Sequence, residues 1–402
     1  MEAPGAEEGG DEMEEAATAG ERFMEAVLRP LLYDESVCDE LMTSGFTSYR
    51  VCARHDSSSS IPSSCQQIAG AGTLIATELE AAHERNETRQ NATRFGSGAT
   101  TVEYRKPGIR ESDLHDSRAR VTQPAASAAL DAAAALLSAA RRDDDDEEED
   151  NGSGSRGGGI VEALSLRGDA QGIAIKLQLN EGVGGCFPAH YDNPGGTNRR
   201  ALTILSYITK PEEREWREED GGELVLLPFL SDRAFLFPPE MGVVVAFRSE
   251  TVLHYTRPSM RRRLLMTVWI DGDKTNDPTQ MQIRVTPGES VHDEAARLIS
   301  SPAQRLVSRA VYTELYESTL RLCLTAGAHS GNGKFNEEED APDICSSASA
   351  SASQMLALHH AQVAYSRRNL PLARLVDRLR LGYSDSIIPA DSRVDVQLYH
   401  PP

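Results

Sequence analysis

The chain has 402 residues and a formal net charge of −21 at pH 7. Nucleic acid and anionic membrane surfaces repel so acidic a protein, so neither is expected as its main partner. No run of about 18 strongly apolar residues is present, and the opening residues, MEAPGAEEGGDEMEE, lack the basic start and apolar core of a secretory signal. The sequence therefore predicts a cytoplasmic or nuclear protein.

The six cysteines lie far apart and form no Cys-x-x-Cys pair. A zinc knuckle needs such pairs, and structural disulfides are rare in reducing compartments. We therefore expect free thiols, with Cys186 as a quiet buried one, and no zinc knuckle.

The first third of the chain alternates between polar and helix-forming segments. Residues 1–20 are acidic and poor in large apolar side chains, which predicts a disordered tail. Residues 21–142 are predicted to form supporting helices and strands, including helices that begin near Thr73 and at Pro124. The polar segment 86–99 predicts a loop.

The remainder of the chain divides by composition into a linker, a β-rich region and a helical region. Residues 143–159 are acidic and glycine-rich, which predicts a linker or loop. Residues 160–275 contain several short β-rich runs, of which 173–180 alternates cleanly between apolar and polar side chains, and so predict a sandwich or jelly-roll barrel within an α+β fold. Residues 276–402 predict a C-terminal helical extension with a disordered Ser- and Ala-rich linker at about 328–352.

A histidine, one spacer and an aspartate, His190-Tyr191-Asp192, precede an Asn-Pro-Gly-Gly turn in the β-rich region. On a strand or strand end, side chains repeat every two residues, so His190 and Asp192 point the same way and Tyr191 faces away. The pair alone would also fit a polar strand end. His254, between two later β-rich runs, completes two imidazoles and one carboxylate, the facial triad of non-heme iron(II) oxygenases.

A basic group follows His254. Oxygenases that use 2-oxoglutarate need a buried cation for its far carboxylate, and the planar fork of arginine suits that task. Strand parity places Arg263 on one face with Thr267 and Trp269, whereas Arg261 and Arg262 precede the strand and are expected to be exposed. We therefore predict Arg263 as the carboxylate anchor and expect Trp269 to serve core packing.

These motifs carry a family resemblance. The stretch from Ile173 to Gly272 resembles the catalytic domain of the 2-oxoglutarate/Fe(II)-dependent dioxygenase superfamily, in its prolyl 4-hydroxylase branch, and is most similar to the intracellular hypoxia-inducible-factor prolyl hydroxylases. The matching pieces, in order, are His190-Tyr191-Asp192-Asn193-Pro194, Tyr207, Gly221-Gly222-Glu223-Leu224, His254, and Arg263 to Trp269.

The resemblance implies a double-stranded β-helix (jelly-roll) core and assigns the site residues. It implies that His190, Asp192 and His254 bind Fe(II), and that Arg263 holds 2-oxoglutarate. Tyr207 and Thr267 would donate hydrogen bonds to the cosubstrate. Asn180 stands where the similar enzymes carry a tyrosine, and it would donate a hydrogen bond in a more open pocket.

The implied reaction is hydroxylation of a proline in a protein or peptide substrate, with O2 as oxidant and succinate and CO2 as products. Ascorbate would keep the iron reduced, and the segment 86–99 would form a lid over the peptide. Two alternatives stay open: an oxygenase of another residue or of a small molecule, and a catalytically silent interaction module. The sequence does not indicate the oligomeric state.

Overall fold

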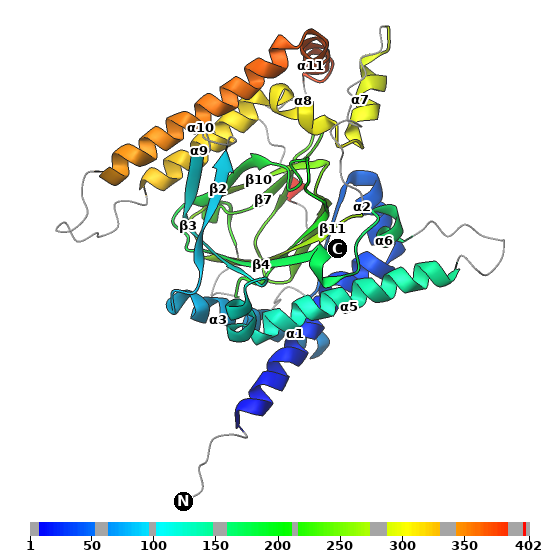
Figure 1. Cartoon of the computed structure of the whole chain (residues 1–402), viewed down its shortest axis with the longest axis vertical. Coiled ribbons are helices and arrows are strands. Elements are labelled where there is room, and N and C mark those ends of the chain that lie inside the picture. The colour runs from blue at the N-terminus through cyan, green and yellow to red at the C-terminus, as the bar shows by residue number, and fades with distance from the viewer. Residues whose placement is uncertain are drawn as a thin grey trace, which may run out of the picture.

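Two sheets face each other at the centre of the chain and helices cover their outer faces (Figure 1). The computed structural model describes residues 8–52, 63–95, 102–147, 159–210, 216–273, 288–329, 343–384 and 397–398. The seven-stranded sheet has the order β1 (Phe46–Arg50), β9 (Val243–Arg248), β6 (Arg200–Tyr207), β11 (Arg263–Asp271), β4 (Ile173–Asn180), β3 (Val102–Asp113), β2 (Arg89–Phe95). The five-stranded sheet has the order β12 (Gln397–Leu398), β8 (Phe235–Phe237), β7 (Leu224–Pro228), β10 (Val252–Ser259), β5 (Gly185–His190). The predicted α+β jelly-roll fold is confirmed.

Strand β4 shows how the sequence builds these layers. Its apolar positions, from Ile173 to Leu179, are completely buried, and they alternate with Lys176, Gln178 and Asn180 on the other face. The apolar face packs against α1 (Glu8–Tyr33), α3 (Ser63–Glu84) and α5 (Pro124–Glu147). The polar face therefore looks into the barrel, where a site can form.

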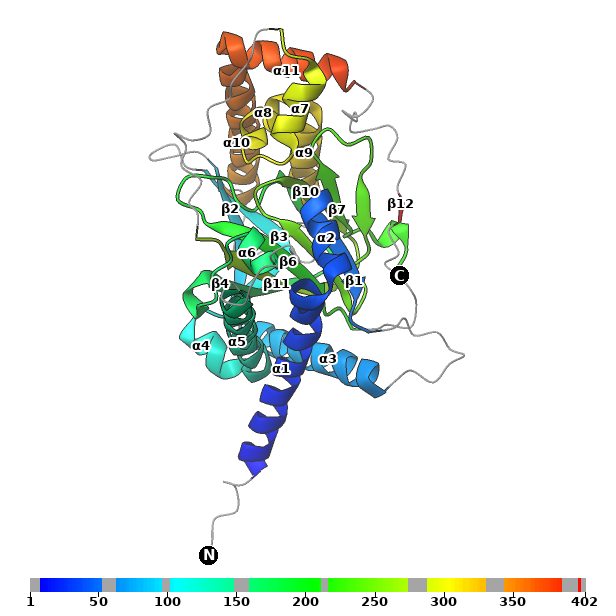
Figure 2. The same ribbon diagram turned by 90° about the vertical axis from the view of Figure 1, so that its right-hand side faces the viewer.

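Two further apolar clusters fix the barrel. One lies between the sheets and contains Tyr207, Phe247 and Leu265. The other lies between the outer face of the five-stranded sheet and the C-terminal helices. These helices are α7 (Val291–Ile299), α8 (Gln304–Val311), α9 (Thr313–His329), α10 (Asp343–Arg368) and α11 (Leu370–Gly382), which lie together beyond the barrel, at the top of Figure 2. The smaller helices are α2 (Glu35–Ser44), α4 (Ser117–Thr122) and α6 (Ile160–Ala163).

The expectation of a disordered tail over residues 1–20 is wrong from Glu8 onward, where α1 begins. The small side chains of this segment allow a close approach of α1 to the alanine-rich α5. Ala16 is buried, and a Cβ on Gly20 would lie 1.9 Å from the carbonyl oxygen of Ala125. Tight packing of small residues thus replaces the large apolar side chains whose absence suggested disorder.

The predicted loop at residues 86–99 is also wrong in part, because Arg89–Phe95 forms strand β2 and pairs with β3. Its polar side chains have partners within the sheet: Asn91 Nδ2 donates to a carboxylate oxygen of Glu111 at 2.6 Å, and Lys106 bonds to Asn91. A polar segment can form a strand when its neighbours satisfy its side chains in this way. The lid predicted there is therefore a hairpin strand over the part that the structure describes, and residues 96–101 lie outside it.

Both predicted linkers are shorter than expected. Helix α5 continues to Glu147, into the linker predicted at 143–159. Helix α10 begins at Asp343, within the disordered segment predicted at about 328–352. Alanine has the highest helix propensity, so the alanine-rich composition of the first half of α10 suits a helix as well as a linker. The rest of the two predicted linkers falls largely outside the described residues, at 148–158 and 330–342.

A disulfide joins Cys186 on β5 to Cys323 on α9, with their Cα atoms 5.5 Å apart. The expectation of free thiols is therefore wrong for this pair, although Cys38, Cys52 and Cys65 are free. The two partners are 137 residues apart in the sequence, and only the packing of α9 on the barrel brings them together. Among the described helices, none has the length and apolarity to cross a membrane.

Candidate active site

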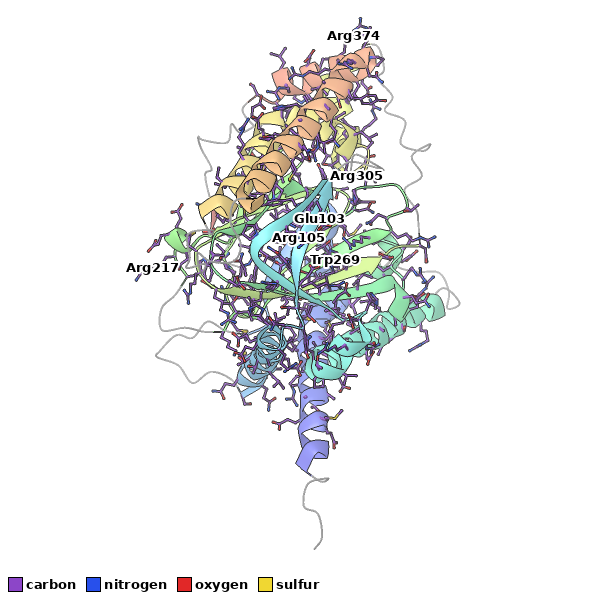
Figure 3. All side chains as sticks on the ribbon, turned by 60° about the vertical axis from the view of Figure 1, so that its left-hand side comes forward. Glu103, Arg105, Arg217, Trp269, Arg305 and Arg374 are labelled. Carbon is purple, nitrogen blue, oxygen red and sulfur yellow. A yellow bond between two sulfur atoms is a disulfide. The ribbon has the colours of Figure 1, made fainter. Side chains whose placement is uncertain are left out.

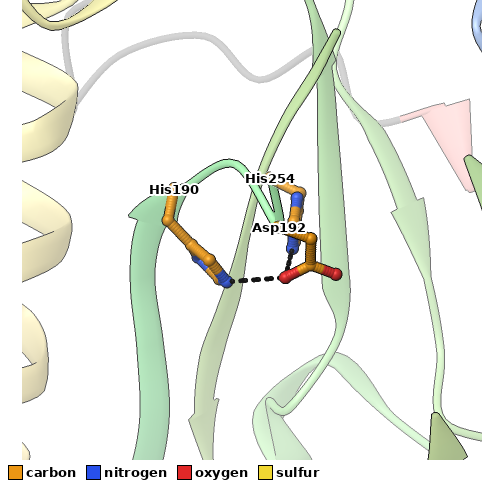
Figure 4. A group of neighbouring side chains, drawn as sticks. All are labelled: His190, Asp192 and His254. Carbon is orange, nitrogen blue, oxygen red and sulfur yellow. Dashed lines mark ion pairs between the residues drawn. The ribbon is translucent and has the colours of Figure 1, made fainter. Parts of the chain in front are cut away.

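The three predicted ligands converge between β5 and β10 inside the barrel (Figure 4). His190 ends β5 and lies directly opposite His254 of β10 in the strand register, with their ring centroids 4.3 Å apart. Asp192 follows just beyond the end of β5. Its Oδ1 lies 3.5 Å from Nε2 of His190 and 3.7 Å from Nε2 of His254. Tyr191 points away and bonds to Ser308 at 3.0 Å, as parity predicts.

Backbone contacts orient both imidazoles. Nδ1 of His190 lies 2.8 Å from the carbonyl oxygen of Pro188, and Nδ1 of His254 lies 3.2 Å from that of Val252. A carbonyl oxygen only accepts, so each Nδ1 carries a proton and donates it to the backbone, and Nε2 of each ring faces Asp192. Burial, with a further effect of His190, lowers the pKa of His254 to about 4. His254 is thus neutral at pH 7, the form that binds a metal.

Two side chains hold the other oxygen of the carboxylate. Asp192 Oδ2 accepts hydrogen bonds from Thr203 Oγ1 at 2.8 Å and from Trp269 Nε1 at 3.0 Å, which leaves Oδ1 facing the imidazoles. Burial opposes the charge of Asp192, but His254, His190 and Trp269 outweigh it and keep its pKa well below the usual range. Trp269 therefore does more than pack, contrary to expectation. The sequence could have predicted this hydrogen bond, because a buried indole N–H usually finds an acceptor.

The donor set fits a divalent transition metal. Two imidazole Nε2 atoms and one carboxylate oxygen, all within 4.8 Å of one another, form the ligand set of a facial 2-His-1-carboxylate iron(II) site. The backbone contacts of Nδ1 direct both Nε2 atoms toward Asp192, and the hydrogen bonds to Oδ2 orient the carboxylate. His190, Asp192 and His254 would therefore hold the metal.

A second group, Glu317, His359 and His360, also brings ligand atoms within 4.8 Å. There, Arg309 donates to Nδ1 of His359 at 3.3 Å, and Arg321 bonds to the Glu317 carboxylate at 2.7 Å. Two guanidinium groups that already contact the ligands oppose a further cation. The barrel site is the better metal candidate.

Arg263 is buried in the barrel, 2% exposed, as predicted. Its guanidinium contacts neutral oxygens: Nη1 donates to the carbonyl of Gly222 at 2.6 Å and Nη2 to Gln178 Oε1 at 3.4 Å, while Nε has no partner. No carboxylate of the described residues lies within ion-pair distance of it. Burial lowers the pKa of Arg263. A buried cation with a donor to spare fits an incoming carboxylate.

The remaining predicted cosubstrate residues lie at different depths of this pocket. Tyr207 is completely buried, and burial raises its pKa to about 12 against the opposing effect of Arg263. Thr267 lies on β11, also buried, on the same face as Arg263 and Trp269. All four side chains therefore line the barrel interior.

Asn180 has a different contact pattern from the one expected. It lies opposite Arg263 in the register, but its amide donates to the carbonyl of Gly185 at 2.9 Å and accepts from the N–H of Gly182 at 3.1 Å. These bonds hold the β4–β5 turn. Gln178, which we did not predict, contacts Arg263 instead. Its inward position follows from the alternation of β4, which could have identified it.

The other two arginines differ from each other. Arg262 is exposed, as expected. Arg261 is not: its side chain is 9% exposed, lies 3.6 Å from the Asp220 carboxylate and stacks over Trp216. The expectation for Arg261 is wrong because the chain segment before β7 folds back over it. Asp220 neutralises its charge, so Arg261 is a poor anchor for a ligand.

Residues 175–271 match the 2OG-Fe(II) oxygenase superfamily. No curated protein matches the chain in sequence. A crystal structure of prolyl 4-hydroxylases from Phytophthora capsici is similar at 27% identity and a TM-score of 0.62, covering 91% of this chain and 95% of that one.

Two further solved structures are more distant. A prolyl-4-hydroxylase from Pseudomonas putida has 19% identity and a TM-score of 0.40, covering 60% of this chain and 99% of that one. A prolyl hydroxylase from Trichoplax adhaerens, in complex with a hypoxia inducible factor peptide, has 17% identity and a TM-score of 0.39, covering 64% and 92%.

Proposed function

We propose that this protein, which carries a 2OG-Fe(II) oxygenase superfamily domain at residues 175–271, is a dioxygenase that hydroxylates a proline of a protein substrate. The observation that carries the proposal is the pairing of two sites in one barrel. Two imidazoles and a carboxylate converge at one end, and a buried arginine without an anionic partner among the described residues lies in the same interior. The similarity to the Phytophthora capsici structure supports proline as the target.

His190, Asp192 and His254 would hold Fe(II), and Arg263 would hold the far carboxylate of 2-oxoglutarate. When bound, iron and cosubstrate supply the oxidation: O2 and 2-oxoglutarate give succinate and CO2, and one oxygen atom is inserted into a substrate C–H bond. Ascorbate is proposed as the reductant that maintains Fe(II).

The protein's own residues position these groups. The carbonyls of Pro188 and Val252 fix the imidazole tautomers, and Thr203 and Trp269 fix the Asp192 carboxylate. Such outer contacts typically change metal affinity or activity by about 10- to 100-fold. Tyr207 and the apolar cluster between the sheets exclude water from the Arg263 end of the pocket, which strengthens its attraction for a carboxylate.

Succinate release by purified protein, supplied with Fe(II), 2-oxoglutarate and proline peptides, tests the proposal. Wild-type protein should release succinate faster when a suitable proline peptide is present. His254→Ala should lose both turnover and bound iron, measured independently by metal analysis. His292→Ala, on the exposed face of α7, is the matched control and should keep both.

The outcomes separate the alternatives. If a small molecule or peptides lacking proline stimulate turnover, the target is that molecule or another residue and not proline. If wild type and His254→Ala both lack bound iron and turnover, the result would favour a catalytically silent interaction module. The predicted cytoplasmic or nuclear location is retained as a proposal, although the Cys186–Cys323 disulfide removes part of its basis.

A further inference from the structure

A cavity of about 970 Å³ leads away from the candidate active site. His190, whose side chain is 36% exposed, lines one end together with Pro194. The walls come from the C-terminal helices: Arg305 and Leu306 from α8, Tyr365 from α10 and Leu372, just inside α11. Figure 3 shows Arg305 where these helices meet the barrel. The cavity therefore adjoins His190, one of the proposed metal ligands.

The charge of this cavity is opposite to that of the chain. The protein has 62 acidic and 41 basic residues, yet among the residues that the structure describes the lining contains Arg305 and Arg309 and no carboxylate. Arg309 donates to His359 and lies 4.4 Å from the ring centroid of Tyr316, and neither partner is an anion. Arg309 therefore offers a positive charge to an acidic ligand, whereas Arg305 also interacts with Glu250.

The arginine nearest the site is held in place by the site's own turn. Arg305 Nη1 donates to Asn193 Oδ1 at 3.0 Å and to the Asn193 carbonyl. Asn193 directly follows Asp192, so this bond connects the helical wall to the metal-ligand segment. A ligand that contacts α8 is thereby positioned relative to the reacting centre.

The same wall exposes apolar surface. Tyr365 is 73% exposed and Leu306 is 47% exposed, although large apolar side chains are usually buried. Both line the cavity, together with Leu358 and Leu372. An exposed apolar patch beside cationic groups is typical of a surface that binds another protein segment.

We propose that this groove binds an acidic segment of the substrate protein, with a carboxylate at Arg309 and an apolar side chain against Leu306 and Tyr365. The inference rests on the proposed function, because it assigns the groove to the substrate of the same site. It names the substrate class: a protein segment in which the target residue is flanked by acidic and apolar side chains.

Fluorescence anisotropy with labelled peptides tests the groove without turnover. The probes share a central proline flanked by leucines and differ only in carrying aspartate, asparagine or lysine at the outer positions. The aspartate peptide should bind wild-type protein about tenfold more tightly than the lysine peptide, as expected for one close charge pair. Arg309→Gln should remove this preference, and Arg309→Glu should reverse it.

Arg374→Gln is the matched control, since Arg374 lies on α11 far from Arg305 and does not line the cavity (Figure 3). It should bind all three peptides as wild type does. Equal binding of the three peptides by wild type would contradict the proposal that the groove binds an acidic segment, whatever the variants do. A charge preference that Arg309→Glu leaves unchanged would overturn it too.

Succinate release separates the two proposals. Charge-dependent binding at Arg309 without any succinate from proline peptides supports the groove and rejects the proposed reaction. Succinate release that is independent of peptide charge and of Arg309 supports the reaction and rejects the groove. If both hold, Arg309→Gln should raise KM for the aspartate peptide about tenfold with a smaller change in kcat, because the contact is made before and during reaction alike.

Discussion

The barrel strands and the C-terminal helices contribute to the site in different ways. Backbone register alone places His190 opposite His254, and strand alternation places Arg263 and Trp269 on one inward face. The C-terminal helices reach the site through side chains: by apolar packing, by hydrogen bonds such as Arg305–Asn193 and Tyr191–Ser308, and by the Cys186–Cys323 disulfide. Changes in the barrel should therefore abolish chemistry, whereas changes in the helices should alter affinity and stability.

The largest effect is expected at the barrel arginine. Arg263→Ala removes the buried cation that would pair with 2-oxoglutarate, which should cost about 3 kcal/mol, or roughly a hundredfold in the KM for this cosubstrate. Arg261→Ala is the matched control, because Arg261 already pairs with Asp220. Succinate release at varied 2-oxoglutarate measures both. Equal changes in the two variants would reject Arg263 as the anchor.

The next effect tests the link between the two regions. Replacing Cys186 and Cys323 together by serine removes a covalent link between residues that are 137 apart in the sequence. This change should lower the free energy of unfolding by about 2–4 kcal/mol. Turnover at low temperature should persist, since the N–H of Ala189 still bonds to Thr319 across β5 and α9. Thermal unfolding measures the change, with Cys65→Ser as control because Cys65 is free. An unchanged midpoint would contradict a stabilising link.

These contrasts explain which parts of the molecule the sequence could predict. Strand alternation needs only a period of two, so the common direction of His190 and Asp192 at the end of β5 and the inward face of Arg263 on β11 followed from spacing. The paired state of Cys186 depends on α9, which lies far along the chain, and the partner of Arg261 depends on a fold-back before β7. Neither leaves a local signal.

Composition misled in the helical parts for a related reason. The segment around Gly20 has small residues and few large apolar side chains, which suggested disorder. These small residues stabilise the fold only when α5 packs against them. The groove likewise exists only after α8, α10 and α11 assemble. Local periodicity thus predicts which side chains of a strand face the interior, and it does not predict a surface that several helices share.

A pH effect should come from the helical region. Burial, aided by Arg309, lowers the pKa of His359 from 6.5 to about 4. Between these values the unfolded chain binds more protons than the folded chain, so stability should fall as the pH drops from about 6.5 toward 4 and stay level above 6.5.

His359→Gln should flatten this dependence by on the order of 1–2 kcal/mol between neutral and mildly acidic pH. Urea unfolding at several pH values, in the presence of a chelator, measures it. His360→Gln is the adjacent control, since His360 is exposed. The interpretation fails if the two variants have the same slope as wild type.

The smallest effect separates positioning from packing inside the barrel. Trp269→Phe keeps an aromatic side chain on the inward face of β11 but removes the indole donor to Asp192 Oδ2, while Thr203 keeps its own bond to that oxygen. Iron affinity should fall about tenfold, as for other outer-sphere ligands of a metal site, with little change in thermal stability. Competition with a metal-binding dye measures the affinity. A loss of stability with unchanged iron affinity would mean that Trp269 serves core packing alone. The expected result would instead show that metal binding depends on the orientation of the Asp192 carboxylate, which two donors on neighbouring strands fix.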